Sequence, residues 1–306
     1  MDFEQILNNC GVDNENPEEV LSCLASLSKM YSSDEMTEIY NYALQYFKSP
    51  EVLIEIIKLA IEGKNATTLP ILTDLLLKNI QDSDNTDAWI NLKVLCAKSI
   101  SKFKDSSSVG ALLYCLNNKN VNYKIRLACA DALGRIGDRY AVSPLIKVVE
   151  DEEEKSVYVK ESATFALGLL GDPSAIDPLV SIMEAKQGLW DKFSFLKEKI
   201  IEVLGRLSIN NEKVLKVFKM SLMDSSPMVR INTIEALMNS EYEEAPELIR
   251  SALQDENEEV QRNAIIALYN ILGRDVLDEV ISLPGYSEFL KNEAKSLIEE
   301  YEEGVE

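Results

Sequence analysis

Histidine is absent from the 306 residues of this chain. Its absence removes Ser-His-Asp and Cys-His nucleophilic catalysis, histidine acid-base steps and the ligand sets of most transition-metal sites. An acid-base role would fall to Asp, Glu, Tyr or Cys. We therefore expect no catalytic residues, no metal site and no cofactor.

Acidic residues gather in short segments that lack the pattern of a reactive site. Oxygen ligands crowd into the segment 82–87, but an EF-hand loop requires Gly at the place of Asp87 and Glu at the place of Lys93. The acidic runs at 150–154 and 299–303 indicate solvated helix ends, not paired catalytic carboxylates. We interpret these acidic residues as surface charge, and they predict neither a calcium site nor a catalytic site.

The elements that position these residues are repeated helices. A segment that begins at Leu127, LACADALGRIGD, returns 34 residues later as ESATFALGLLGD. Apolar residues before the Gly-Asp pair fall at helical spacing, and a second helical stripe follows the pair. Gly can end a helix in the left-handed conformation, and Asp can cap the next helix. Each unit is predicted to be a helix, a tight turn and a second helix.

The same register recurs through most of the chain. With Arg126 as the anchor, the equivalent positions are Val20, Leu53, Lys93, Arg126, Lys160, Lys197, Arg230 and Gln261. Their intervals of 31 to 40 residues match known helical-pair repeats. Six units have a helix N-cap residue four positions before the anchor, namely Asn16, Ser49, Asn122, Ser156, Ser226 and Asn257. The pattern predicts an all-α chain of about eight antiparallel helix pairs.

These units resemble the HEAT-repeat superfamily, and within it the short HEAT-like repeats named after phycobilisome lyases. The motif is carried best by Ile125-Arg126, Ala132-Leu133-Gly134, Gly137-Asp138 and Pro144-Leu145. The resemblance implies a right-handed α-solenoid, a HEAT-like or armadillo-type superhelix.

The extent of the repeats predicts the domain organisation. We expect one continuous module over 1–306, with an N-terminal cap at 1–15, repeats over 16–284 and a C-terminal capping helix at 285–306. No run approaches the roughly 18 apolar residues of a membrane helix. The start MDFEQILNNC has neither a basic nor an apolar signal region. We expect a cytoplasmic protein without membrane insertion.

Basic residues recur at the anchor position. They are Lys93, Arg126, Lys160, Lys197 and Arg230. In HEAT repeats a basic residue at this place pairs with aspartates of the turn, and the resemblance implies Asp105, Asp138 and Asp172 as these partners. We interpret the set as a structural ladder of ion pairs.

The five cysteines form no CxxC pair. Three of them occupy a position three residues after the anchor, which alanine fills in other units: Cys23, Cys96 and Cys129. A close helix contact accepts a small apolar side chain, and a free thiol serves there. We interpret these three as structural and leave Cys10 and Cys115 unassigned.

The two longest intervals between anchors hold the only tryptophans, Trp89 and Trp190. The units that follow have Trp89 and Phe193 where other units have a cap residue. Tryptophan is a favoured interface anchor, and loops of rigid scaffolds carry binding residues. In the alternative interpretation each tryptophan is an apolar plug that packs against the solenoid. We take Trp89, Trp190 and Phe193 as candidates for partner binding.

Stacked helix pairs curve and leave a long concave groove. We expect the second helix of each pair to line it, which brings Ser143, Lys147, Asp177 and Ser181 to the groove. The net charge of −21 argues against nucleic acid, whose phosphates require clustered Lys and Arg. It favours a partner protein with a basic or neutral surface.

Two functions stay open. The first is a non-catalytic scaffold or adaptor that holds a protein partner along the groove, and we predict this one because no reactive constellation is present. The second is implied by the resemblance, since phycobilisome lyases of this repeat type attach or isomerise bilin chromophores. Nucleic-acid binding ranks last.

Overall fold

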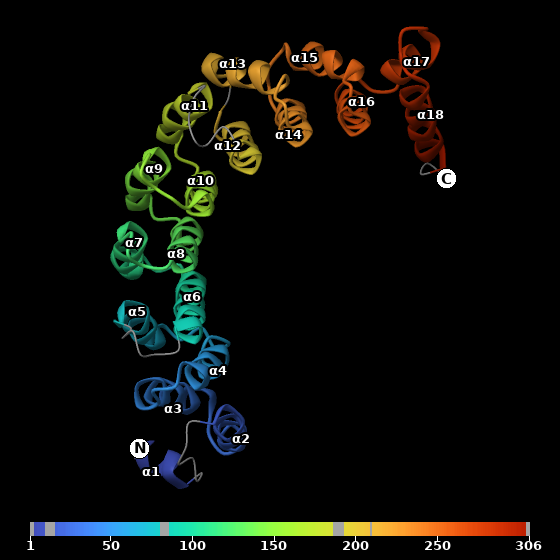
Figure 1. The fold of residues 1–306 in the computed structure, drawn as a ribbon. Helices are drawn as coiled ribbons and strands as arrows, with labels where there is room; N and C mark the ends of the chain where they lie inside the picture. The colour runs from blue at the N-terminus through green and yellow to red at the C-terminus, as the bar shows by residue number, and fades with distance from the viewer. Residues whose placement is uncertain (1–2, 10–15, 80–85, 186–192, 209, 304–306) are drawn as a thin grey trace. The chain divides into compact units, whose positions relative to one another are not determined.

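A computed structural model describes residues 3–9, 16–79, 86–185, 193–208 and 210–303. Within these ranges every regular element is a helix (Figure 1). The anchors lie on α2 (Pro17–Leu27), α4 (Pro50–Ala60), α6 (Thr86–Phe103), α8 (Tyr123–Ile136), α10 (Val157–Leu170), α12 (Ser194–Leu207), α14 (Pro227–Met238) and α16 (Glu258–Leu272).

Between these helices lie their partners. They are α3 (Ser33–Tyr46), α5 (Leu69–Leu77), α7 (Val109–Asn117), α9 (Val142–Glu150), α11 (Ile176–Glu184), α13 (Glu212–Ser221), α15 (Ala245–Ser251) and α17 (Asp275–Ser282). Helices α1 (Phe3–Asn9) and α18 (Glu288–Glu303) stand at the two ends. The predicted α-solenoid of helix pairs is confirmed.

The chain divides into two compact units. The first holds residues 1–148 and 153–170, and the second holds 149–152 and 171–306. In each unit the anchor-bearing helices form an inner row on the concave side, and their partners form an outer row (Figure 1). The single continuous module over 1–306 stays a prediction.

Cap residues set where the inner helices begin. Five of the six predicted caps accept a backbone N–H on the side chain, namely Asn16, Ser49, Asn122, Ser156 and Asn257. Ser226 stands at the cap position of α14, but its side chain accepts no such bond. The spacing of polar residues therefore predicted these helix starts, Ser226 included.

Glycines with positive φ make the tight turns after α8 and α10. Gly137 has φ 84° and Gly171 has φ 68°, a conformation that other residues adopt only with strain. Asp138 then caps the short helix η3 (Arg139–Ala141), and Asp172 caps η4 (Pro173–Ala175). The Gly-Asp pair thus reverses the chain between the two helices of a unit.

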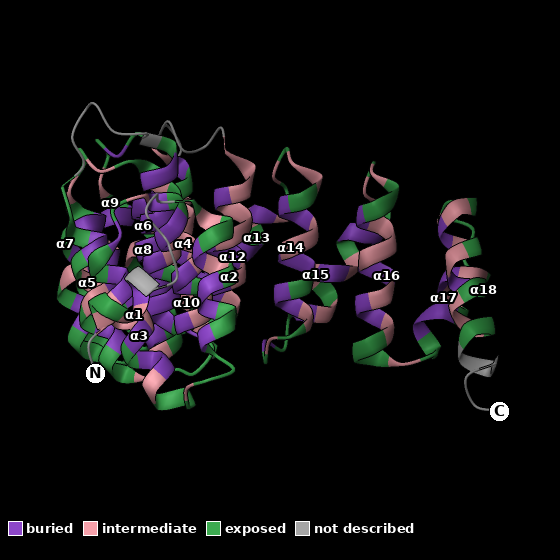
Figure 2. Ribbon diagram, turned by 90° about the horizontal axis from the view of Figure 1, so that it is seen from below, coloured by how far each residue is buried: buried purple, intermediate pink, exposed green. Residues whose placement is uncertain are grey.

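Small residues bring neighbouring inner helices close together. Gly134 of α8 faces Ala166 of α10, and a Cβ added at Gly134 would lie 2.6 Å from the Ala166 Cα. In the second unit a Cβ at Gly205 would lie 3.1 Å from the Cβ of Ala236. Close spacing within one row places that row on the inside of the curve. Buried residues lie between the helices, and half-buried or exposed residues follow the remaining face (Figure 2).

The helix predicted over 285–306 is present as α18, whose Leu290 and Ala294 are fully buried. They cover the last repeat of the second unit, where α18 packs on α16 and α17. Within the described ranges, no helix is both long and apolar enough to span a membrane.

Candidate functional site

A ladder of buried ion pairs runs through the repeats. The Arg126 Nε donates to the carbonyl of Leu116 at 2.8 Å, and the Arg126 guanidinium forms two hydrogen bonds with Glu154. In the second unit Arg230 donates to the carbonyl of Asp224 and to the carboxylate of Asp255, both at 2.7 Å. Each arginine therefore links the outer-row segment before its helix to the segment that follows its helix pair.

The ladder acids also hold the starts of the next inner helices. Glu154, Asp224 and Asp255 accept the backbone N–H of the residue two positions later, which is Ser156, Ser226 or Asn257, each at 2.9 Å. Asp224 also accepts a hydrogen bond from the Lys197 amine at 2.7 Å. An acid two residues before a cap residue is the sequence signal that would have identified these partners.

The anchor arginines pair with Glu154 and Asp255 and not with the predicted turn aspartates. Asp105, Asp138 and Asp172 accept backbone N–H groups at the starts of short 3-10 helices, from Ser107, Tyr140 and Ser174 at 2.7, 2.8 and 2.9 Å. The turn aspartates face the helix that they cap, whereas the anchor side chains run toward the segments before and after the pair. Hydrogen bonds from Ser106 and from the Tyr140 N–H hold the pKa of Asp138 below its usual value.

Lys93 and Lys160 complete the buried basic residues of the first unit. Lys160 is fully buried. The Lys93 amine donates to the carbonyl of Lys78, and burial lowers the pKa of Lys93. Asn120 stands two residues before the cap Asn122, where other units have the ladder acid. The Lys93 unit therefore keeps the backbone link of the ladder but lacks its usual carboxylate.

Three free cysteines, Cys96, Cys115 and Cys129, are buried near Lys93. Burial raises the pKa of Cys96 to about 12, which keeps this thiol protonated and unreactive. The structural interpretation fits Cys96 and Cys129. Cys23 is also buried but is disulfide-bonded, so the expectation of a free thiol there was wrong.

Trp89 lies in the core at the start of α6. Only 6% of the residue is exposed, and the Lys78 amine lies 4.4 Å from the ring centroid. This burial favours the plug interpretation over an interface anchor. Phe193 is half-buried, and its ring meets the Phe195 ring edge-on with 5.8 Å between centroids. Trp190 lies outside the described residues.

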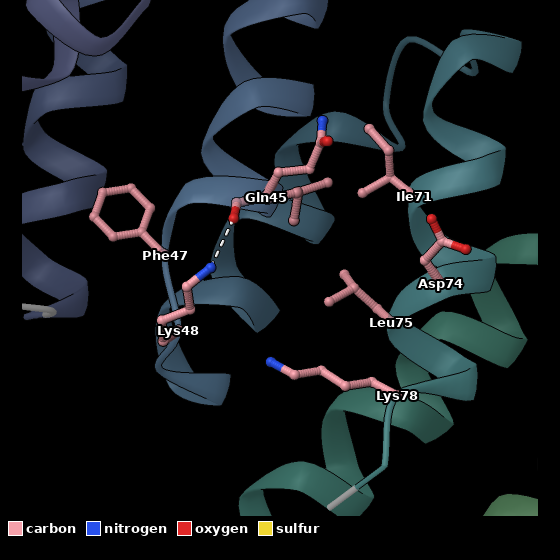
Figure 3. A pocket seen from close by; sticks show the side chains of 8 residues that line it. Gln45, Phe47, Lys48, Ile71, Asp74, Leu75 and Lys78 are labelled. Carbon is pink, nitrogen blue, oxygen red and sulfur yellow. Dashed lines mark hydrogen bonds between the residues drawn. The ribbon is translucent and has the colours of Figure 1, made fainter.

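A small pocket of about 330 Å³ opens near Lys78, between the ends of α3 and α5 (Figure 3). Its apolar lining comes from Leu44, Phe47, Ile71 and Leu75, and its polar lining from Gln45, Lys48, Asp74 and Lys78. The Lys48 amine donates to the carbonyl of Gln45 at 3.0 Å. Both lysines of the pocket therefore contact the protein itself: Lys48 binds the end of α3, and Lys78 lies over the Trp89 ring.

The residues predicted to line the groove lie on the outer row. Ser143 and Lys147 are exposed on α9, and Asp177 and Ser181 are exposed on α11 (Figure 1). Asp177 forms an ion pair with Lys213 of α13 at 2.7 Å. The prediction placed the wrong helix of each pair on the concave side, because it did not use the Gly and Ala residues that let the anchor-bearing helices pack closely.

The inner row of the first unit carries an exposed aromatic pair. Tyr123 of α8 is 43% exposed and Tyr158 of α10 is 52% exposed, with 6.4 Å between ring centroids. Further along α10, Phe165 is half-buried and Leu169 is exposed. Residues 158, 165 and 169 recur at helical spacing on one stripe. Helix α10 thus presents Tyr158, Phe165 and Leu169 along one stripe, with the half-buried Ser162 between the first two.

Exposed lysines lie on the two inner-row helices that precede α10. Lys98 and Lys102 of α6 and Lys124 of α8 are exposed, and in the described part of the chain their side chains make no ion pair. Residues 91–149 contain ten Lys and Arg against three Asp, a net charge of +7 in a chain of −21. We call the set Lys98, Lys102, Tyr123, Lys124, Tyr158, Phe165 and Leu169 the tyrosine–lysine face.

Among the described residues, no group of three or more His, Cys, Asp or Glu is arranged to hold a metal ion. The first unit exposes aromatic rings, apolar side chains and lysines that make no ion pair among the described residues.

A family model for HEAT repeats matches residues 109–192, 187–269 and 214–284, which together are more than half of the chain. The chain belongs to the HEAT-repeat family. Its buried ladder, caps and Gly-Asp turns are the frame of these HEAT repeats. No curated protein matches the chain in sequence.

Several solved structures match the chain at low identity. The complex of CpcE and CpcF of phycocyanin lyase from Nostoc sp. PCC7120 is 20% identical with a TM-score of 0.47, over 75% of this chain and 94% of that one. The archaeal HEAT-like repeats protein from Thermococcus onnurineus NA1 is 17% identical, with a TM-score of 0.44 over 76% and 96%. Human deoxyhypusine hydroxylase is 16% identical, with a TM-score of 0.35 over 88% and 96%.

Proposed function

We propose that this HEAT-repeat protein is a non-catalytic scaffold that holds a partner protein on the inner row of its first unit. The tyrosine–lysine face carries this proposal. Tyrosine supplies large contact area at little entropic cost and is enriched among residues that dominate binding energy. Two exposed tyrosines in ring contact, beside an apolar stripe, support a protein interface better than a solvated surface.

The charge of the face selects the partner. Lys98, Lys102 and Lys124 have no carboxylate partner in the described structure, so an acidic segment would gain ion pairs without breaking any in the scaffold. Complementary charge raises association rates and rejects partners of like charge. The net charge of −21 predicted a basic or neutral partner, but it averages over the whole chain and hides the segment 91–149, whose net charge is +7. We propose an acidic segment with apolar anchors for this face.

Site-specific photo-crosslinking tests this function. In one variant a benzophenone amino acid replaces Leu127, which is half-buried on α8. In a second variant it replaces Tyr114, which is exposed on the outer-row helix α7. We expect position 127 to capture a protein through an acidic segment, and position 114 to capture none of it. The variant Lys98→Glu/Lys102→Glu/Lys124→Glu should abolish this capture, whereas Lys147→Glu on the outer row should leave it unchanged.

Three outcomes would contradict the proposal. Capture that survives the triple charge reversal would remove the electrostatic basis. Tight binding of single-stranded DNA or RNA to the wild-type chain, lost in the triple variant, would show that the lysines serve phosphates. A shift in visible absorbance on mixing the protein with a bilin would favour the phycobilisome-lyase-like alternative over a scaffold.

A further inference from the structure

The inner row of the second unit carries asparagines at equivalent positions of two neighbouring helices. Asn232 lies on α14 and Asn239 is the C-cap residue of that helix, seven residues later, while Asn263 and Asn270 lie seven apart on α16. Both pairs are offset by 31 residues, as are the anchors of these repeats. Helices α14 and α16 pack side by side (Figure 2). We call these four residues the asparagine face.

The asparagine side chains are partly ordered by their own helices. The Nδ2 groups of Asn232, Asn239 and Asn263 donate to the carbonyl four residues earlier, at 2.9, 2.9 and 2.8 Å. Asn270 directs its Nδ2 to the Met238 sulfur of α14 at 3.5 Å. A primary amide has two N–H groups and an oxygen with two lone pairs, so each side chain keeps further donor and acceptor capacity.

This composition is unusual for an exposed helical stripe. Glu, Lys and Arg form helices more readily than Asn, and none of the four asparagines is buried. Full burial therefore does not explain their recurrence in the same two positions of consecutive repeats. The peptide group of another chain is a matching ligand, because it also offers one donor and one acceptor.

The spacing of the two asparagine rows fits one extended chain. Seven residues of α-helix rise about 10.5 Å. A strand that forms hydrogen bonds along both edges occupies a width of about 9.6 Å, since each neighbour lies about 4.8 Å away. Asn232 and Asn263 form one row of asparagines, and Asn239 and Asn270 form the other. An extended segment that crosses α14 and α16 between these two rows would meet one row along each of its edges.

The residues between the rows indicate the side chains of the ligand. Glu235 of α14 is exposed, makes no ion pair in the described structure and lies midway between Asn232 and Asn239. Ile266 holds the equivalent position on α16 and is half-buried. The one cation of this face, Arg262, is held by Glu293 and Glu259 at 2.9 and 2.8 Å. The face between the rows therefore presents one free carboxylate and one apolar side chain.

We propose that the asparagine face binds the main chain of an extended peptide segment, with a Lys or Arg over Glu235 and an apolar residue over Ile266. This site goes beyond the proposed function, because it lies on the other unit and takes a basic ligand. The two proposals therefore stand or fall separately.

A labelled decapeptide of alternating Lys and Val is the probe, and fluorescence anisotropy on the full chain is the measurement. Replacing all four asparagines by alanine should weaken binding at least about tenfold, because several hydrogen bonds to the ligand main chain are lost. Alanine favours the helix, and circular dichroism verifies the fold. Asn292→Ala, at an exposed site of α18, is the matched control and should have no effect.

The second arm changes the ligand and leaves the protein intact. A decapeptide with N-methyl groups on its backbone keeps its charges and side chains but loses main-chain donors, and it should also bind at least about tenfold more weakly. Glu235→Gln should weaken the Lys-Val peptide, and Lys98→Glu/Lys102→Glu/Lys124→Glu should not. Equal binding of the N-methylated and unmodified peptides, or undiminished binding to the alanine variant, would overturn the proposal.

Discussion

The inner rows of the two units share a frame but present different chemistry. In the first unit, the inner-row helix α10 carries Tyr158 and Phe165, whereas α14 in the second unit has Met228 and Glu235 at the same register positions. Behind both faces an anchor arginine bonds an outer-row carbonyl and a carboxylate. The comparison separates residues that hold the repeat together from residues that are free to specify a ligand.

The largest expected effect comes from the ladder, which both units share. Arg126→Ala should lower the free energy of unfolding by about 3–5 kcal/mol, because it leaves the buried Glu154 carboxylate without its partner. Arg230→Ala should cost less, since Asp255 is more exposed than Glu154. Urea unfolding followed by circular dichroism gives both values.

A double variant sharpens this prediction. Arg126→Met with Glu154→Leu removes both charges and should lose less stability than Arg126→Ala alone, because no buried charge remains. Equal losses in the single and double variants would show that the arginine acts by packing and not by its charge.

The close helix contacts should give the next largest effect. Gly134→Ala places a methyl group 2.6 Å from the backbone of Ala166, while Gly205→Ala meets the Ala236 side chain at 3.1 Å. Overpacking of this kind typically costs about 1–3 kcal/mol. We expect Gly134→Ala to approach the upper end and Gly205→Ala to stay below it in thermal unfolding. A reversed order would contradict the tighter inner row of the first unit.

Variants of the face residues should leave the frame nearly unchanged. Tyr123→Ala with Tyr158→Ala removes an exposed ring pair, worth about 0.5–1.5 kcal/mol of stability, but should reduce crosslinking at position 127 at least about tenfold. The measurement is crosslinking yield at matched helicity. If the crosslinking yield falls only in proportion to the helicity that is lost, the tyrosines stabilise the repeat and do not bind the partner.

The smallest expected effect is on the pH dependence of stability, and it comes from the aspartate of a Gly-Asp turn. The pKa of Asp138 is lowered in the folded chain, so its stabilisation is present above the unfolded pKa and is lost as the pH falls through the folded value. Asp138→Asn should therefore lessen the decline of stability below about pH 4. A carboxyl titration by NMR that shows no lowered pKa would remove this contribution.

The frame was largely predictable from sequence because its signals are local. Gly137 with Asp138, and cap residues such as Asn122, act within a few residues of their position, so spacing reveals them. The ladder acids needed one more pattern, the acid two residues before the cap, as at Glu154. Ser226 shows the limit, because a cap residue in the right place does not guarantee the bond.

The candidate faces were harder to predict because they depend on which row curves inward. That choice follows from contacts between repeats, such as Gly134 against Ala166, and the helical stripe of one unit does not contain it. Ser143 and Lys147 were therefore assigned to the wrong side. Net charge also hid the basic region at 91–149 within an acidic chain.

A binding experiment with two peptides tests the central claim, that one frame carries two faces of different specificity. Labelled decapeptides of alternating Glu and Leu and of alternating Lys and Val are titrated against the wild type, the triple Lys→Glu variant and the quadruple Asn→Ala variant. The account predicts that the first variant loses only the acidic peptide and the second only the basic peptide. Loss of both peptides in the same variant, or of neither in both, would contradict it.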